Sequence, residues 1–304
     1  MPLTAVALVL LAALGHALWN LAAKHAGGDQ RFVLLTALII AAIWAPVGVW
    51  AGWDEVPRWG ALEWGVIAAS AVTHVAYFTV LLRGYRASDL TVVYPVARGS
   101  GPLVSAIGAL WLLDERLGAL GALGIAAMAL GVFLLAGGPT LVAALRGGAA
   151  RAAIPAEARA ARQRVRLGIG YGLVTGIAIA GYTLIDGYAV KVLLISPLLV
   201  DYFGNLLRIP ISLPFALRDP AATFAAWKAH WRWALVVAVL SPTSYVLVLY
   251  AMTLAPLSHV APLREVSMLF AAMLGGRLLG EGDRAARFAG AACIALGVTG
   301  LALG

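Results

Sequence analysis

Long apolar runs separated by short polar connections extend along the whole chain. A run of about 20 apolar residues is long enough to cross the hydrocarbon core of a bilayer as a helix. By this length the sequence predicts ten membrane-spanning helices, at residues 3–23, 32–52, 61–82, 90–113, 117–137, 167–190, 197–217, 233–254, 257–279 and 285–303. The seventh is the least regular, because polar residues and prolines interrupt it: Asp201, Asn205, Arg208, Pro210 and Pro214. We therefore expect an all-α polytopic membrane protein.

The apolar pattern also repeats itself at an offset of 166 residues. AMALGVFLLA at 127–136 is similar to CIALGVTGLA at 293–302. The same offset pairs Arg98 with Arg264, Glu115 with Glu281, Gly124 with Gly290, Gly15 with Gly181, and Asn20 with Asp186. Two five-helix repeats are thus predicted, at 1–137 and 167–304, joined by an arginine-rich linker at 138–166. Because five is odd, we expect the repeats to be inverted relative to each other, as in many transporters.

Composition agrees with the membrane assignment, and charge adds an orientation. Of the 304 residues, 62% are hydrophobic and only 12% are charged, against about a quarter in soluble domains. The loops after the odd-numbered helices, with their helix ends, hold 16 of the 22 Lys and Arg residues, whereas the opposite side holds three. The positive-inside rule then predicts a cytoplasmic central loop and outside termini, in the cytoplasmic (inner) membrane of a bacterium. The net charge of +8 is explained by this topology and indicates no nucleic-acid partner.

Three arginines and three acids fall well inside the predicted spans: Arg98, Arg208, Arg264, Asp186, Asp201 and Glu265. Each costs about 2.5–3.5 kcal/mol on insertion scales, so a functional role is the first hypothesis. The equal numbers of arginines and acids favour mutual pairing as the alternative, above all for Arg264 beside Glu265. Prolines and glycines flank Arg98, at Pro95, Gly99, Gly101 and Pro102. We expect them to interrupt its helix, which would then line a central cavity where the guanidinium binds a solute anion.

Aromatic and polar residues on other helices could line the same cavity. His16 and Asn20 share a helix face beside Trp19, as His74 and Tyr77 do. Together with their repeat-related positions, they give the candidate solute-binding set of Arg98, His74, Tyr77, Trp19, Asn20, Tyr182, Asp186, Tyr245, Arg264 and Glu265. Candidates for proton coupling are His16, His74 and Asp201. The alternative is that these residues are interfacial aromatics and interhelical hydrogen bonds.

Other recurring residues have structural explanations. Glycines at helix-packing spacings, such as Gly124 and Gly131, are expected to let helices approach closely. Glu115 and Glu281 are expected to cap or orient the next helix. The single cysteine, Cys293, excludes an internal disulfide and cysteine-ligated metal sites, and we expect no metal or cofactor. The zinc-protease pattern HExxH and the Walker A pattern are absent, so we expect neither an enzyme nor an ATP-driven pump.

The stretches YPVARGSGPLVSAIGALWLLDERLG and APLREVSMLFAAMLGGRLLGE, with the two repeated final helices, resemble the drug/metabolite transporter superfamily, EamA branch. The resemblance implies a ten-helix secondary transporter that works by alternating access without ATP, with many relatives exporting amino acids or other small metabolites. Many relatives carry their positive charge at the termini, whereas this chain carries it in the loops, which weakens any transfer of transport direction.

We therefore expect a secondary active or facilitative carrier, exporting an amino-acid-like, anionic or zwitterionic solute. The alternatives are an exporter of cations or drugs, a flippase of lipid-linked intermediates and an intramembrane enzyme. The expected partners are a small-molecule solute and membrane lipid, with the choice between monomer and homodimer left open.

Overall fold

The structure, a computed structural model, describes residues 1–26, 30–88, 90–135, 156–274 and 284–304. All regular structure in these ranges is helical. The helices are α1 (Leu3–His25), α2 (Gln30–Gly52), the 3₁₀ turn η1 (Val56–Arg58), α3 (Ala61–Ala87), α4 (Leu90–Leu112), α5 (Ala119–Leu135), α7 (Ala156–Lys191), α8 (Pro197–Leu217), α9 (Pro220–Leu254), α10 (Leu257–Leu263), α11 (Val266–Leu274) and α12 (Arg284–Leu303). The predicted all-α fold is thereby confirmed for the described residues.

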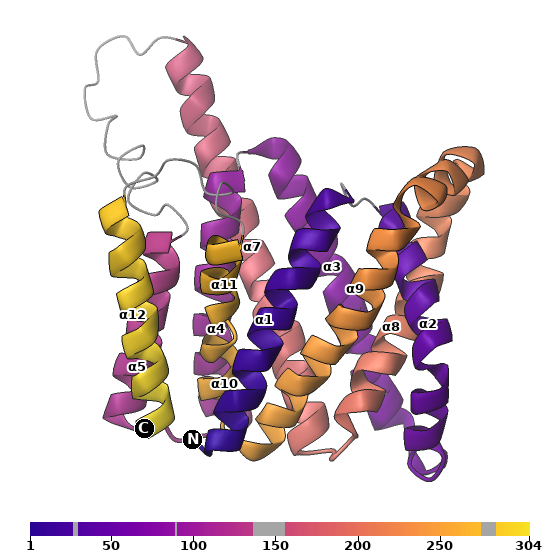
Figure 1. The fold of residues 1–304 in the computed structure, drawn as a ribbon, viewed down its shortest axis with the longest axis horizontal. Coiled ribbons are helices and arrows are strands. Elements are labelled where there is room, and N and C mark those ends of the chain that lie inside the picture. Colours follow the sequence, from indigo (N-terminus) through magenta and orange to yellow (C-terminus); the bar gives the residue numbers. More distant parts are fainter. Residues whose placement is uncertain (27–29, 89, 136–155, 275–283) are drawn as a thin grey trace.

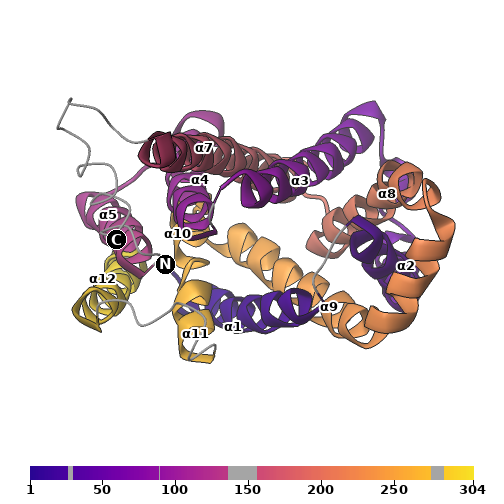
Figure 2. The same cartoon turned by 90° about the horizontal axis from the view of Figure 1, so that it is seen from above.

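The helices form two layers closed by a helix pair at each end (Figures 1 and 2). In Figure 2, α3, α4 and α7 lie along one side, and α1, α9 and α11 along the other. The α5–α12 pair closes one end and the α2–α8 pair closes the other. The two termini lie together, and the amine of Met1 donates a hydrogen bond of 2.8 Å to the carbonyl of Ala302.

Glycines allow the closest helix contacts, as their spacing predicts. A Cβ added to Gly124 would lie 2.8 Å from the backbone nitrogen of Leu301, and one added to Gly131 would lie 2.8 Å from the carbonyl oxygen of Gly290. Real Cβ atoms do not approach backbone so closely, so the α5–α12 pair depends on these glycines. The packing interpretation of the glycine spacing is therefore confirmed for this pair.

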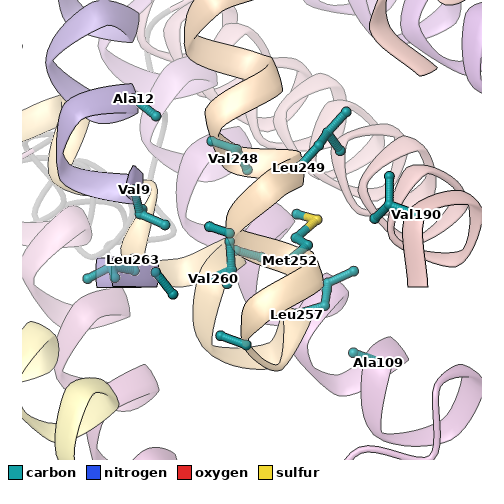
Figure 3. Packing of buried hydrophobic residues seen from close by; sticks show 14 of the residues in the cluster. Val9, Ala12, Ala109, Val190, Val248, Leu249, Met252, Leu257, Val260 and Leu263 are labelled. Atoms are coloured by element: carbon teal, nitrogen blue, oxygen red, sulfur yellow. The ribbon is translucent and has the colours of Figure 1, made fainter. Parts of the chain in front are cut away.

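The largest cluster of buried apolar side chains lies at the end of the bundle that holds the termini. There α1, α4, α7, α9 and α10 converge, and Figure 3 labels Val9, Ala109, Val190, Met252 and Leu257 as one representative from each. All five side chains are at most 2% exposed. This end of the molecule is thus closed by packed apolar side chains.

Several predicted boundaries differ from the structure. By length and composition, five helical segments in the described ranges could cross a membrane: Leu3–Ala23, Gln30–Gly52, Ala61–Ala87, Gln163–Lys191 and Pro220–Leu254. Two more, Ala119–Leu134 and Phe288–Leu303, are apolar but shorter. Ten spans therefore remain a prediction. The linker expected at 138–166 is helical from residue 156 onward, as part of α7, and its earlier part lies outside the described residues.

Candidate functional site

A buried carboxylate lies between two arginines near the middle of the bundle. Nε of Arg98 lies 2.9 Å from Oε2 of Glu265, and Nε of Arg264 lies 3.8 Å from Oε1 of the same side chain. Arg264 and Glu265 are 2% and 1% exposed. Arg98 also donates a hydrogen bond of 3.1 Å from Nη2 to the hydroxyl of Ser267. One carboxylate is thus the counter-ion of two guanidinium groups, and the cluster of Arg98, Arg264 and Glu265 carries a net charge of +1.

The backbone positions this cluster through a break in the ninth predicted span. α10 ends at Leu263 and α11 begins at Val266, with Arg264 and Glu265 in the turn between them. Pro262 is one cause, since a proline has no amide hydrogen to donate within a helix. The turn contains i→i−3 hydrogen bonds of the 3₁₀ type. One runs from the amide of Glu265 to the carbonyl of Pro262, at 2.9 Å. In Figure 1, α10 lies toward the termini and α11 away from them.

The expected interruption at Arg98 is wrong. α4 is a continuous helix through Pro95, Gly99, Gly101 and Pro102. The interruption lies instead at the repeat-related Arg264. Arg98 therefore reaches the cluster from an intact helix, and irregular backbone is supplied by the opposite half of the chain.

The carboxylate of Glu265 is held by charge more than by hydrogen bonds. Within the described ranges neither of its oxygens has a hydrogen-bond partner of acceptable geometry, and the same holds for Nε and Nη2 of Arg264. Buried polar groups are normally hydrogen-bonded, so each exception needs an explanation. Arg98 and Glu265 border a cavity of about 10 Å³, enough for about one water molecule. These groups therefore retain bonding capacity that a small bound species could use.

A second cluster gathers four aromatic rings around Asp186. The Tyr245 hydroxyl donates a short hydrogen bond to Oδ2 of Asp186. The His74 ring stacks on Tyr182 with centroids 3.9 Å apart, and Tyr77 lies 5.7 Å from Tyr182. Tyr245 completes the group, 5.8 Å from His74. The structure thus brings together five of the predicted site residues, from α3, α7 and α9.

Arg208 and Asp201 extend this cluster from α8. Asn205 lies between them: it donates a hydrogen bond of 3.0 Å to Oδ2 of Asp201 and accepts one of 3.1 Å from Nη1 of Arg208. Arg208 interacts electrostatically with both Asp201 and Asp186. With both carboxyl groups ionised, this second cluster carries a net charge of −1. Asp201 therefore belongs to an ion network.

Tyr182 lies between the two clusters. Besides stacking on His74, it interacts electrostatically with Arg98 and Arg264. Tyr182 therefore adjoins both the positive Arg98–Glu265–Arg264 cluster and the negative Asp186–Asp201–Arg208 cluster, which also interact through Arg264 and Asp186.

The α1 candidates are less closely joined to these clusters. His16 is buried and binds the carbonyl of Ala12 at 2.8 Å through Nδ1, and it interacts electrostatically with Arg264 and Arg98. The exposed Asn20 donates a hydrogen bond of 2.6 Å to the carbonyl of His16, within its own helix. Trp19 lies 5.9 Å from the His16 ring. Of these three, His16 lies nearest to the charged cluster.

Glu115 has the capping role expected of it, but for a helix in the other half of the chain. Its carboxylate accepts hydrogen bonds from the amides of Leu257 (2.7 Å) and Ser258 (2.9 Å) at the start of α10. Lys191, at the end of α7, donates a third at 2.9 Å. The contact joins the α4–α5 connection to α7 and α10. Glu281 lies outside the described residues.

Three polar residues in these clusters were absent from the predicted set: Ser267, Asn205 and Arg208. Arg208 was recognised as an intramembrane charge, and Asn205, three residues before it, shares its helix face. This spacing is a usable signal. Ser267 gives no comparable signal, because a serine in an apolar helix commonly bonds its own backbone.

Comparison with known proteins finds a transporter family over the second half of the chain. Residues 166–303 match the EamA-like transporter family. Among 26 matching chains of solved structures, one crystal structure has a TM-score of 0.66 at 18% identity, covering 98% of this chain and 96% of the other. At this identity the likeness concerns the fold alone. No curated protein matches the chain.

Proposed function

We propose that the chain belongs to the EamA-like transporter family, which residues 166–303 match, and that it carries an amino-acid-like zwitterion across a membrane by alternating access. The carrier is secondary active or facilitative, and it exports its solute. Ten spans in two inverted repeats form its framework.

Helix packing supports the inverted repeats. With the 166-residue offset, α1 corresponds to α7 and α3 to α9. α3 packs on α7 as α1 packs on α9, and α4 packs on α7 as α11 packs on α1. The two end pairs, α5–α12 and α2–α8, each join corresponding helices. Exchanging the two halves therefore maps these contacts onto one another, as expected for repeats related by a two-fold axis in the membrane plane.

The observation that carries the solute class is the uncompensated charge at Arg98, Glu265 and Arg264. A buried net charge of +1 is stabilised by an anion, and a guanidinium suits a carboxylate geometrically. Across Tyr182, the cluster around Asp186 carries the opposite net charge and presents aromatic faces, which attract cations. A solute with a carboxylate at one end and an ammonium at the other would complement both clusters.

One observation favours the cation exporter as a second candidate. The ion pair between Arg98 and Glu265 weakens the repulsion that Arg98 would exert on a cation, and Asp186 lies among tyrosines. Arg264 still leaves the cluster positive, however. A cationic solute would therefore have to occupy the region around Asp186 alone.

The orientation follows from the charge distribution. In Figure 1 the termini and the connections that contain Arg58, Arg116 and Lys191 lie at one end of the bundle. We assign this end to the outside and the arginine-rich end to the cytoplasm of a bacterium. The apolar cluster of Figure 3 then closes the outer side in this state. Alternating access would require the bundle to be closed at one side at a time, and we assign this closure to the outer side.

The test is solute counterflow in proteoliposomes, with the common amino acids, alkylphosphonates and cationic dyes as solutes. Wild type is compared with Arg98→Ala and Arg98→Lys, after each variant has been checked for folding. We expect a zwitterionic amino acid to exchange in wild type, and both variants to lose this exchange. Transport of the dyes alone, or undiminished exchange in Arg98→Ala, would overturn the proposal.

A further inference from the structure

Glu265 occupies the position that a solute carboxylate would need. Its Oε2 lies 2.9 Å from Nε of Arg98, and the neighbouring cavity of about 10 Å³ has no room for a solute carboxylate beside it. An anion that binds the Nε side of this guanidinium must therefore displace Glu265.

We propose that Glu265 is a resident counter-anion, which a solute carboxylate replaces on Arg98 while Glu265 moves toward Arg264. This inference rests on the proposed function and specifies how the same site is regulated. Since the empty site has one carboxylate for two arginines, a bound solute supplies the second carboxylate. The occupied cluster is then neutral.

Two features make the exchange feasible. The first is that neither oxygen of Glu265 has a well-formed hydrogen bond within the described ranges, so leaving Arg98 breaks an ion pair but no hydrogen bond. The second is that Nε and Nη2 of Arg264 also lack hydrogen bonds there, and Nε is already 3.8 Å from Oε1 of Glu265. A second partner for the displaced carboxylate is therefore present beside it.

The exchange would also alter the helix break. Glu265 lies in the turn between α10 and α11, and together with Ser267 it joins this turn to Arg98 of α4. Displacement of Glu265 from Arg98 removes one of these two contacts between α4 and the turn. Solute binding is thereby linked to the point in α10–α11 where helical hydrogen bonding is already interrupted.

The proposal predicts that removing Glu265 creates a carboxylate site. Purified Glu265→Ala is unfolded thermally in increasing acetate, with ionic strength held constant by chloride, beside wild type and the double variant Arg98→Ala/Glu265→Ala. Occupation of Arg98 by Glu265 lowers the apparent acetate affinity of wild type in proportion to the fraction of free guanidinium. We expect half-maximal stabilisation of Glu265→Ala at about tenfold less acetate than wild type needs, and none in the double variant.

Equal acetate dependence in wild type and Glu265→Ala would overturn the proposal, and so would stabilisation that persists without Arg98. Should Glu265→Ala fail to fold, Glu265→Gln keeps the shape and removes the charge, and the same difference from wild type is expected. The acetate measurement needs no transport. A positive result together with no amino-acid exchange in wild type would therefore disprove the proposed function while supporting the counter-anion.

Discussion

α4 and the α10–α11 region occupy corresponding places in the two halves of the sequence, yet their backbones differ. α4 is continuous from Leu90 to Leu112, whereas α10 and α11 are separated at Arg264 and Glu265. The residue that follows Arg98 is Gly99, and the residue that follows Arg264 is Glu265. Each half therefore contributes one arginine to the charged cluster, but only the second half contributes a carboxylate.

The helices behind these two regions differ as well. α4 packs on glycines of α7, and a Cβ added to Gly172 would lie 2.7 Å from Cβ of Val96. The position of α1 that corresponds to Gly172 is Val6. The glycine contact at Gly172 thus supports the continuous helix, and valine replaces this glycine behind the broken one. A near-symmetric repeat has become asymmetric at the point where a solute would bind.

The largest effect is expected from removing the arginine of the continuous helix. Arg98→Ala leaves Glu265 buried with only the more distant Arg264, and breaking a buried ion pair costs about 3–5 kcal/mol. We expect a lower Tm and a loss of amino-acid exchange of about 100-fold, close to 2.7 kcal/mol. Thermal unfolding and counterflow measure the two effects. Arg264→Ala is the matched variant and should lose less stability, since the 2.9 Å pair remains; equal losses would contradict the asymmetry.

A second prediction gives α4 the carboxylate that it lacks. Within the described ranges no atom beyond its own helix lies within 4 Å of a Cβ built on Gly99, and the residue borders the cavity beside Arg98 and Glu265. Gly99→Glu would bring the cluster to neutrality, and we expect solute affinity to fall by about tenfold or more. Equilibrium binding of the amino acid that exchanges fastest measures this loss.

Gly99→Ala is the control for added bulk at the same position, and it should weaken binding far less than Gly99→Glu. Equal losses in the two variants would show that space, and not charge, determines the effect.

The glycine contact behind α4 gives a third prediction. Gly172→Ala places a methyl group against Val96 and the carbonyl oxygen of Val93, at 2.7 and 2.9 Å, and overpacking of this kind costs about 1–3 kcal/mol. The methyl group of Gly170→Ala, on the same helix, would meet no atom within 4 Å among the described residues outside its own helix turn. We expect a lower Tm for Gly172→Ala only, measured by thermal unfolding in detergent. Similar melting of both variants would argue against a close α4–α7 contact.

The smallest effect concerns the start of the broken helix. Burial alone would raise the pKa of Glu115, but hydrogen bonds from Lys191 and from the amides of Ser258 and Leu257 outweigh it and hold the pKa below its ordinary value of 4.5. A depressed folded-state pKa stabilises the protein above the unfolded-state pKa, and this stability is lost as pH falls through the folded value.

We therefore expect Glu115→Gln to lower stability by about 1–2 kcal/mol at pH 7, and by progressively less below about pH 4.5. Thermal unfolding of wild type and variant across this pH range measures the difference. A constant difference would exclude the ionised cap.

Sequence patterns predicted the helices better than their ends. The predicted segment 197–217 coincides with α8, whereas α9 begins at Pro220 and not near residue 233. Hydropathy detects the apolar part of a helix, and the polar turns that continue it beyond the apolar part give no such signal.

The sequence predicted which residues form the charged site, but it did not predict which acid pairs with Arg98. Three acids were available to Arg98, and its partner, Glu265, lies 167 residues away in the chain. The helix break was assigned to the wrong half, because prolines accompany both Arg98 and Arg264. Local sequence therefore cannot distinguish the two helices, and their tertiary surroundings differ: Gly172 of α7 packs closely on α4, whereas Val6 occupies the corresponding position of α1.

The most direct test compares an amino acid with its methyl ester, for the amino acid that exchanges fastest in proteoliposomes. Titration calorimetry gives the ratio of their affinities in wild type and in Arg98→Ala. If Arg98 receives the solute carboxylate, wild type should bind the amino acid about tenfold or more tightly than the ester, and the ratio should fall to about one in Arg98→Ala. A ratio that is unchanged in folded Arg98→Ala would contradict the account, because the carboxylate would then be recognised elsewhere.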